Sequence, residues 1–294
     1  MSKKIIITGG SGFLGSEIAA RLKARGYFVV ILDIIPPRDS TLNFVKANLS
    51  ESIPKDELLK NPKSVINLAG TPIFGKWNKE KKKLIYDSRI LGTRNLVSLF
   101  EDTEFRPEVF VSASAVGFYG EQGEKEITIN TEKGSGFLSD VCLDWEKEVL
   151  QAKNFNIKTT IIRNGLILGK SGLIKVLRPY YEWGIGGPIG NGKQWMPWIH
   201  VEDCAELYIK ASVGELNQGV INAVAPEKIQ NKLFSKTFAK ILHRPHFLFI
   251  PIFALKVLYG GFANEIAVSQ KIKTEIDGFD FKYKNIEEAL KDII

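Results

Sequence analysis

Three glycines close to the start of the sequence have the spacing of a phosphate-binding loop. Gly9, Gly12 and Gly15 lie in the segment TGGSGFLG of residues 8–15. Backbone N–H groups and a helix N-terminus solvate a pyrophosphate well, but only where no Cβ blocks the approach. An apolar run precedes the loop and an amphipathic segment follows it, which is the context that the motif requires. The loop therefore predicts a dinucleotide site, and a plain strand–helix turn is the alternative.

Asp33 follows the next apolar run and could recognise the ribose of an adenosine. It stands 18 residues after Gly15, where a carboxylate can accept hydrogen bonds from both ribose hydroxyls. Its negative charge repels a 2′-phosphate, so Asp33 favours NAD over NADP as the cofactor. Arg38 could still bind a 2′-phosphate, and Asp33 could instead begin the turn that contains Pro36 and Pro37.

Short apolar runs alternate with longer amphipathic segments through the first half of the chain. Residues 16–25 predict a helix, because Leu14, Ile18 and Leu22 recur at helical spacing and a glycine ends the pattern. The apolar runs are nearly continuous, as in strands buried on both faces of a parallel sheet. The predicted strands are residues 5–7, 28–32, 44–47, 65–68, 109–111, 160–162 and 220–222. The predicted fold class is α/β, a Rossmann-type doubly wound parallel sheet.

The character of the sequence changes after Arg163. Residues 184–198 hold five glycines, two prolines and two tryptophans, which indicates a shaped loop. A helix over residues 201–212 follows, and the tail from about residue 227 is expected to be helical. We expect two parts, listed here by residue number: a dinucleotide-binding domain of residues 1–165 with 198–226 returning to it, and a smaller, mostly helical substrate-side lobe of residues 166–197 and 227–294.

The composition is ordinary for a soluble globular protein. The chain has 294 residues, of which 44% are hydrophobic and 25% charged, so it can bury a core without disulfides or metals. Two cysteines and the absence of a secretory signal favour a cytoplasmic location. The formal net charge is +7, but the densest basic run, residues 79–83, is typical of a solvated helix start. We therefore expect no nucleic-acid partner, and the sparse cysteines and histidines predict no metal site.

The most apolar late stretch is residues 247–258, which contains Pro251 and Lys256. It falls short of the roughly 20 residues that a membrane-spanning helix needs. We expect the stretch to be buried or to face a partner, with no membrane association. The protein is expected to be a monomer or a homodimer that binds a small-molecule substrate.

Several segments together resemble a known family. The segments TGGSGFLG, LD, VINLAG, FVSASAVGFYG and IHVED are similar to the extended short-chain dehydrogenase/reductases of the NAD-dependent epimerase/dehydratase type. The segments GGPIGNGKQWMPWIH, NAVAPE and GFDFKYKNIEEALKDI resemble a subgroup labelled epimerase-family or cell-division-inhibitor-like, which has its own small C-terminal domain. The resemblance covers nearly the whole chain.

The resemblance implies further cofactor contacts. Asn48 and Leu49 stand where the family has a pair that touches the adenine, and Ser112 is expected near the nicotinamide end. Besides Gly9, Gly12, Gly15 and Asp33, the implied cofactor-binding residues are Phe13, Leu14, Asn48, Leu49, Leu68, Ala69, Gly70, Ser112 and Arg163.

The family's proton-transfer pair is missing. Relatives use a Tyr-x-x-x-Lys pair on one helix face, in which the lysine charge lowers the tyrosine pKa, together with a serine that Ser114 matches. Counting onward from Ser114 places Leu138 at the tyrosine position and Cys142 at the lysine position. Leucine carries no exchangeable proton and a thiol brings no positive charge, so neither replaces its counterpart.

Other residues could take over the chemistry. Tyr119 lies just past Ser114 and could donate a proton, although a packed loop aromatic is the simpler interpretation. His200 could act as an acid or base, and Arg89 could bind an anionic substrate or simply cap its helix. The expected catalytic residues are Ser114 and Tyr119, and the expected substrate-side residues are Arg89, Trp195, Trp198 and His200.

Two functions follow from these patterns. The first is an NAD(P)-binding enzyme of the epimerase, dehydratase or reductase kind, acting on a small, sugar-like or carbonyl substrate with a non-standard acid. The second is a dinucleotide-binding sensor without turnover. The missing Tyr/Lys pair favours the sensor, whereas the elaborate loop of residues 184–198 favours the enzyme.

Overall fold

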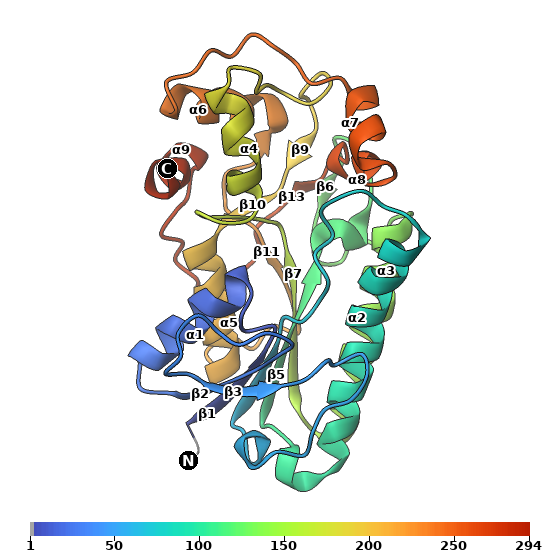
Figure 1. Cartoon of the computed structure of the whole chain (residues 1–294), viewed down its shortest axis with the longest axis vertical. Helices are drawn as coiled ribbons and strands as arrows, with labels where there is room; N and C mark the ends of the chain where they lie inside the picture. The colour runs from blue at the N-terminus through green and yellow to red at the C-terminus, as the bar shows by residue number, and fades with distance from the viewer. Residues whose placement is uncertain (1–2) are drawn as a thin grey trace.

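A seven-stranded parallel sheet forms the centre of the molecule (Figure 1). The computed structural model describes residues 3–294, and the strand order is β11-β7-β5-β4-β1-β2-β3. All six pairings in this sheet are parallel. The strands are β1 (Lys4–Thr8), β2 (Phe28–Asp33), β3 (Asn43–Lys46), β4 (Ser64–Asn67), β5 (Val109–Ala115), β7 (Lys158–Asn164) and β11 (Val220–Ala223). This sheet confirms the predicted α/β fold class.

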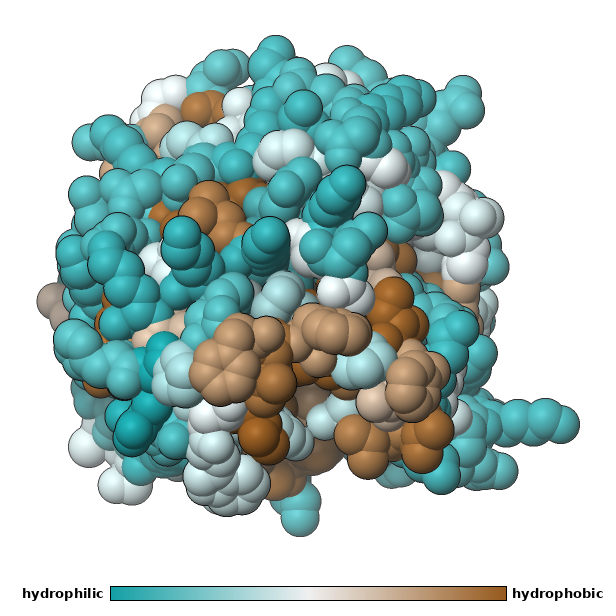
Figure 2. Space-filling view, turned by 90° about the horizontal axis from the view of Figure 1, so that it is seen from above, coloured by the Kyte–Doolittle hydropathy of each residue, from teal (hydrophilic) through white to brown (hydrophobic). Residues whose placement is uncertain are grey.

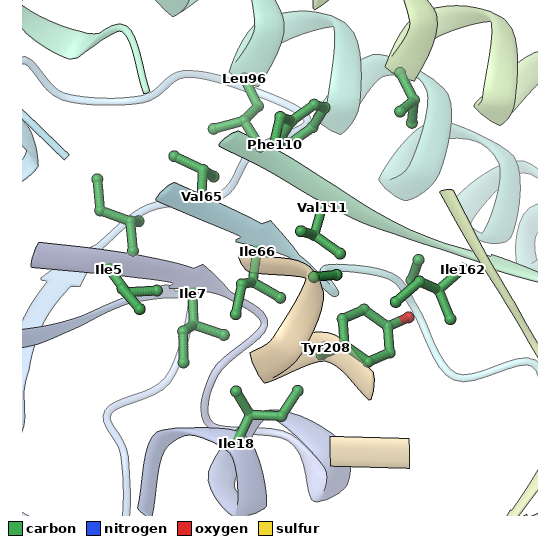
Figure 3. Close-up of a cluster of buried hydrophobic side chains, with 14 of the residues drawn as sticks. Ile5, Ile7, Ile18, Val65, Ile66, Leu96, Phe110, Val111, Ile162 and Tyr208 are labelled. Atoms are coloured by element: carbon green, nitrogen blue, oxygen red, sulfur yellow. The ribbon is translucent and has the colours of Figure 1, made fainter. Parts of the chain in front are cut away.

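The continuous apolar runs of these strands are buried because helices cover both faces of the sheet. On one face lie α1 (Phe13–Ala24) and α5 (Val201–Val213), which pack together, and on the other lie α2 (Lys79–Ser98) and α3 (Phe137–Leu150). Figure 3 shows apolar side chains of the strands between Ile18 of α1, Tyr208 of α5 and Leu96 of α2. The main core is therefore continuous through the sheet.

A smaller lobe continues above the sheet (Figure 1). Its own core joins residues from across the second half of the chain, among them Leu168, Trp198, Phe238 and Leu290. The remaining helices are α4 (Leu173–Glu182), α6 (Asn231–Ile241), α7 (Ile252–Tyr259), α8 (Phe262–Ile266) and α9 (Ile286–Ile293). The remaining strands are β6 (Glu126–Ile127), β8 (Leu166–Leu168), β9 (Trp195–Met196), β10 (Trp198–His200), β12 (Ile229–Gln230) and β13 (Lys271–Ile272). No helix in the described part of the chain combines the length and apolar character needed to cross a bilayer.

The strand order indicates where on the sheet a ligand would bind. The chain runs outward from β1 to β2 and β3, and then returns to the other side of β1 to begin β4. In open α/β sheets, ligands bind outside the carboxyl ends of the strands where the order reverses in this way. The carboxyl ends of β1, β2, β4 and β5 lie there and carry the glycine loop, Asp33, Leu68 and Ser114.

Candidate dinucleotide and substrate site

The glycine loop folds tightly against the end of β4. A Cβ on Gly15 would lie 2.5 Å from the carbonyl oxygen of Gly9, and Gly9 has a positive φ of 66°. A Cβ on Gly9 would lie 2.9 Å from the backbone of Leu68 and Ala69. These two glycines are therefore required by the packing of the loop itself. Gly12 differs, because it is exposed and a Cβ there would meet only the Gly9 oxygen, at 3.2 Å.

The space beside Gly12 lies at the open end of α1. Gly12 is the N-cap of this helix, no side chain caps it, and the first turn carries no acidic residue. The first N–H groups of a helix have no partner within the helix and attract anions. An uncapped helix end without a Cβ in front of it fits a pyrophosphate, which is the group that the sequence predicts there. Phe13 and Leu14, the first residues of α1, lie beside this end.

Asp33 is fixed beside the same loop. Its Oδ2 accepts a hydrogen bond from the Ser11 N–H at 3.0 Å, and its Oδ1 accepts one from the Ile34 N–H at 2.7 Å. The carboxylate is half-buried and has remaining acceptor capacity for further donors. Its orientation is thus set by the backbone at the point where an adenosine ribose would leave the pyrophosphate.

The other expected nucleotide contacts divide into two groups. Leu68 and Ala69 lie next to Gly9, and the Leu68 N–H donates to the Thr8 carbonyl at 3.1 Å, while Gly70 lies against Arg89. Asn48 is exposed, and its amide donates to Glu51 at 2.8 Å. Leu49 is buried against Gly92 of α2, so its side chain belongs to the core.

Ser112 lies inside the sheet. It is fully buried, and its hydroxyl accepts a hydrogen bond from the Asn67 amide at 3.1 Å. The same amide donates to Thr93 at 3.0 Å, while Asn67 Oδ1 accepts from Thr8 at 2.6 Å. This hydroxyl links β4 to β5 inside the protein, and the expected place of Ser112 near the nicotinamide end stays a prediction.

Ser114 and Tyr119 are both held in a buried polar network. Ser114 is 2% exposed and its hydroxyl donates to Glu146 Oε1 at 2.6 Å. Arg163 donates from Nε and Nη2 to the two Glu146 oxygens at 2.8 and 2.7 Å, and from Nη1 to the Tyr119 hydroxyl at 2.8 Å. The Tyr119 hydroxyl in turn donates to Asn222 at 2.8 Å. A single network therefore joins β5, β7, β11 and α3.

This network engages three side chains that the sequence assigns to the site, Tyr119, Arg163 and Ser114. Tyr119 is fully buried, and burial raises the pKa of its phenol despite the neighbouring Arg163. Its hydroxyl contacts Arg163 and Asn222, and its expected catalytic role stays a prediction. Arg163 is 5% exposed and pairs with Glu146, so it stabilises the sheet from within, and its expected cofactor contact stays a prediction. Ser114 points its hydroxyl into the same network, at Glu146, and its expected catalytic role stays a prediction.

Leu138 and Cys142 do lie beside the strand end where the missing pair would stand. A Cβ on Gly117, in the turn of 3₁₀ helix η4 (Val116–Tyr119) after β5, would lie 3.4 Å from the Leu138 Cβ and 3.8 Å from the Cys142 Sγ. Burial raises the pKa of the Cys142 thiol to about 11, so it is neutral at physiological pH. This side of the site is apolar and has no proton to exchange near neutral pH.

Arg89 is the cation of the site. Its Nη1 donates to the carbonyls of Thr71 at 3.0 Å and Ile85 at 3.2 Å, and its guanidinium lies 5.3 Å from the Trp145 ring centroid. A Cβ on Gly70 would lie 3.0 Å from its Cζ. Burial lowers the pKa of Arg89, although a guanidinium stays charged in proteins. Across residues 3–294, no carboxylate forms an ion pair with it.

Two of the residues expected on the substrate side, Trp198 and His200, are buried. Trp198 is 1% exposed in the core of the small lobe, where its Nε1 donates to the Glu227 carbonyl at 3.1 Å. His200 is also buried: its Nδ1 accepts from the Glu202 N–H at the start of α5, its ring stacks on Tyr283, and burial lowers its pKa. Both side chains are buried in the packing of the small lobe and the tail, and their expected place at a substrate stays a prediction. Trp195 is half-buried, and its Nε1 donates to Glu124 at 2.8 Å.

Sequence reasoning missed the residues that organise the network. Glu146 lies four residues after Cys142 and eight after Leu138, so all three lie on one face of the helix. This spacing is the signal that could have indicated the contact of Glu146 with Ser114. Asn222 and Asn67 gave no such signal, because their partners lie far away in the sequence. Tyr119 and Asn222 are separated by 103 positions.

The sheet order, the glycine loop and the uncapped α1 define a Rossmann-type protein of the extended short-chain dehydrogenase/reductase class. The model of the NAD dependent epimerase/dehydratase family matches residues 5–223, and the chain belongs to this family. This match confirms the resemblance that the motifs indicate.

Two relatives and one solved structure are similar over nearly the whole chain. The chain is 36% identical to the epimerase family protein YfhF of Bacillus subtilis, over 99% of this chain and 97% of that protein. It is 34% identical to the chloroplastic epimerase family protein SDR39U1 homolog of Arabidopsis thaliana, over 99% and 86%. The crystal structure of the human epimerase family protein SDR39U1 with NADPH superposes with a TM-score of 0.84, at 26% identity over 99% and 98% of the two chains.

Proposed function

We propose that this protein is an NAD-dependent oxidoreductase that acts on a small substrate carrying a carboxylate or another anionic group. The observation that carries the proposal is Arg89, a partly buried cation without an acidic partner among residues 3–294. A buried charge is costly unless it is paired. An anionic ligand that enters the site would supply the missing partner.

The position of Arg89 suits this role. It lies on α2 against Gly70, at the end of the strand that borders the dinucleotide loop. Its two hydrogen bonds to the protein both use Nη1, so Nη2 and Nε can form a fork toward a carboxylate. The Trp145 ring beneath the guanidinium holds it in place.

The cofactor preference rests on Asp33. When bound, NAD would supply or accept a hydride at the substrate carbon. Its pyrophosphate fits the N-terminus of α1 at Gly12, and its adenosine ribose fits the Asp33 carboxylate. A 2′-phosphate would bring a second negative charge to that carboxylate, so we expect NAD in place of the NADPH present in the human relative's structure.

The proton chemistry must differ from that of the Tyr/Lys enzymes. Ser114 and Tyr119 are engaged in the internal network, and Leu138 and Cys142 offer no acid. In reduction, NADH would supply a hydride to a carbonyl carbon, and the nearby positive charge of Arg89, whose fork holds the carboxylate, would stabilise the negative charge that develops on the carbonyl oxygen. That oxygen then takes its proton from water, so no side-chain acid is required.

The test compares substrates that differ in one charge. We expect NADH oxidation with 2-oxo acids and much slower oxidation with their amides, measured by nicotinamide absorbance. Arg89→Met should reduce kcat/KM for the acid by roughly a hundredfold or more, the worth of about 3 kcal/mol for a lost charged contact. Arg89→Lys should retain part of the activity, and the exposed cation Lys170→Met serves as the matched control. Equal turnover of acid and amide by the parent protein would contradict the proposal.

A second candidate function is a dinucleotide-binding sensor without turnover. Leu138 and Cys142 favour it, because they turn the family's acid–base face into an apolar surface. The same substrate panel separates the two functions. Tight NADH binding without oxidation of any anionic or neutral substrate would support the sensor.

A further inference from the structure

The top of the small lobe exposes an unusual number of large apolar side chains. Trp183 is 75% exposed, Phe247 76%, Phe253 72% and Val257 76%. We call this surface the apical patch; it comprises Trp183, Ile185, Phe247, Phe249, Phe253, Val257 and Leu258. Figure 2 looks down on the lobe and shows apolar side chains gathered within a hydrophilic surround. Contiguous exposed apolar surface of this kind marks an interaction site.

Two segments of the chain form the patch together. The turn after α4 carries Trp183 and Ile185, and the segment 247–258 passes along it. Ile189 and Ile250 form a parallel β-bridge, and a Cβ on Gly184 would lie 3.7 Å from Pro245. The patch is therefore a single surface of the folded lobe. Its exposure also decides between the two sequence expectations for residues 247–258: the segment is not buried.

The charge of the same region is strongly positive. Residues 228–261 contain six Lys and Arg residues and no Asp or Glu, in a chain whose net charge is +7. Lys228 and Lys240 pair with carboxylates from elsewhere in the chain, Glu126 and Glu287. Among residues 3–294, the other four have no ion pair: Lys232, Lys236, Arg244 and Lys256. The chain segment that supplies most of the apical patch thus also carries exposed cations without an ion pair among residues 3–294.

We propose that the apical patch is a docking surface for the anionic face of a lipid membrane. Phe, Leu and Trp side chains that project outward enter the boundary between headgroups and acyl chains, while Lys and Arg remain among anionic headgroups. The sequence expectation of no membrane association rested on the segment being too short to span a bilayer, and a surface contact requires no spanning segment.

The charge argues against a second copy as the occupant. A two-fold contact brings the same surface of both molecules together, so the basic segments of both copies would face each other. The anchors of the patch also protrude, with about three-quarters of Phe247 and Val257 exposed. Protruding anchors with cations around them match a soft anionic surface better than a second positively charged protein surface.

The experiment is co-sedimentation of the purified full chain with vesicles. We expect binding to vesicles of equal parts phosphatidylcholine and phosphatidylglycerol, little binding to pure phosphatidylcholine, and release by high salt. The Phe247→Ser/Phe253→Ser variant should bind at least tenfold more weakly, and so should Arg244→Glu/Lys256→Glu. All four positions are exposed. Because Phe253 and Lys256 also belong to the short α7, circular dichroism should confirm that the variants fold.

Matched control variants place the same changes elsewhere. Leu84→Ser/Leu150→Ser removes exposed apolar side chains from α2 and α3, and Lys153→Glu/Lys170→Glu reverses exposed charges away from the patch. These controls should bind like the parent chain. Absence of binding to the anionic vesicles, or equal loss in patch and control variants, would overturn the proposal. A dimer in light scattering that only the patch variants dissociate would also overturn it, in favour of a second copy.

Discussion

The preference for NAD can be tested by neutralising one carboxylate. In Asp33→Asn the side chain keeps its shape and loses its charge. The exposed Asp39→Asn, a few residues further along, is the matched control because its carboxylate pairs with Lys23 on the surface. The prediction concerns the ratio of the two dissociation constants, for NADH and for NADPH.

The expected magnitude follows from Coulomb's law. A 2′-phosphate carries about two negative charges and would sit about 5 Å from the Asp33 carboxylate, which costs roughly 1.7 kcal/mol in a water-like dielectric. Asp33 is half-buried and fixed by Ser11 and Ile34, so the true cost lies above that limit, at about 2–3 kcal/mol. The parent protein should therefore bind NADH roughly 30–150-fold more tightly than NADPH, because each 1.4 kcal/mol is a factor of ten.

In Asp33→Asn, the preference for NADH over NADPH should disappear because both affinities change. NADPH binding should improve because the repulsion disappears. NADH binding should weaken by roughly tenfold, since a charged acceptor for the ribose hydroxyls is lost. Isothermal titration calorimetry of both nucleotides with the parent and the two variants measures all six constants. Equal affinity of the parent for NADH and NADPH, or an unchanged ratio in Asp33→Asn, would refute the reasoning.

Two further predictions concern the apolar face and the buried network. Leu138→Tyr/Cys142→Lys should raise turnover of neutral carbonyl substrates by roughly a hundredfold or more if it folds, because it restores an acid and its charge; an unchanged rate in the folded variant would show that this face does not reach the substrate. Glu146→Gln should lower the free energy of unfolding in urea by about 3–5 kcal/mol, because it leaves the buried Arg163 without a counter-charge; Glu148→Gln, whose partner is solvent-exposed, should have a far smaller effect, and equal losses would contradict the network.

The fold followed from the sequence because its signals are local. Continuous apolar runs such as residues 28–32 indicate strands buried on both faces of a sheet. The glycine loop identifies the strand before it as the first strand of a dinucleotide-binding unit. The predicted helix at residues 16–25 begins earlier, at Phe13, because a helix whose N-cap is Gly12 starts directly at the loop.

The site was only partly predictable because side-chain direction depends on distant residues. Ser114 and Tyr119 stand at the expected strand end, yet Glu146, Arg163 and Asn222 bind their hydroxyls inside the protein. Trp198 was expected at the substrate because it belongs to the shaped loop of residues 184–198, and His200 because it could act as an acid or base. The tail of the chain packs over them at Glu227 and Tyr283. Arg89 became informative only when the structure showed that no carboxylate among residues 3–294 pairs with it.

The most direct test of the account is nucleotide binding by Gly12→Val. Gly12 has a φ of −74°, which valine can adopt, and it is exposed, so the variant should fold. Gly219→Val, where a Cβ meets nothing within 4 Å, is the matched control. Calorimetric titration should show NADH binding by the parent and the control, and a loss of at least about a hundredfold in Gly12→Val, because its side chain fills the space in front of α1. Unchanged affinity in a Gly12→Val protein with a native circular dichroism spectrum would contradict the dinucleotide site itself.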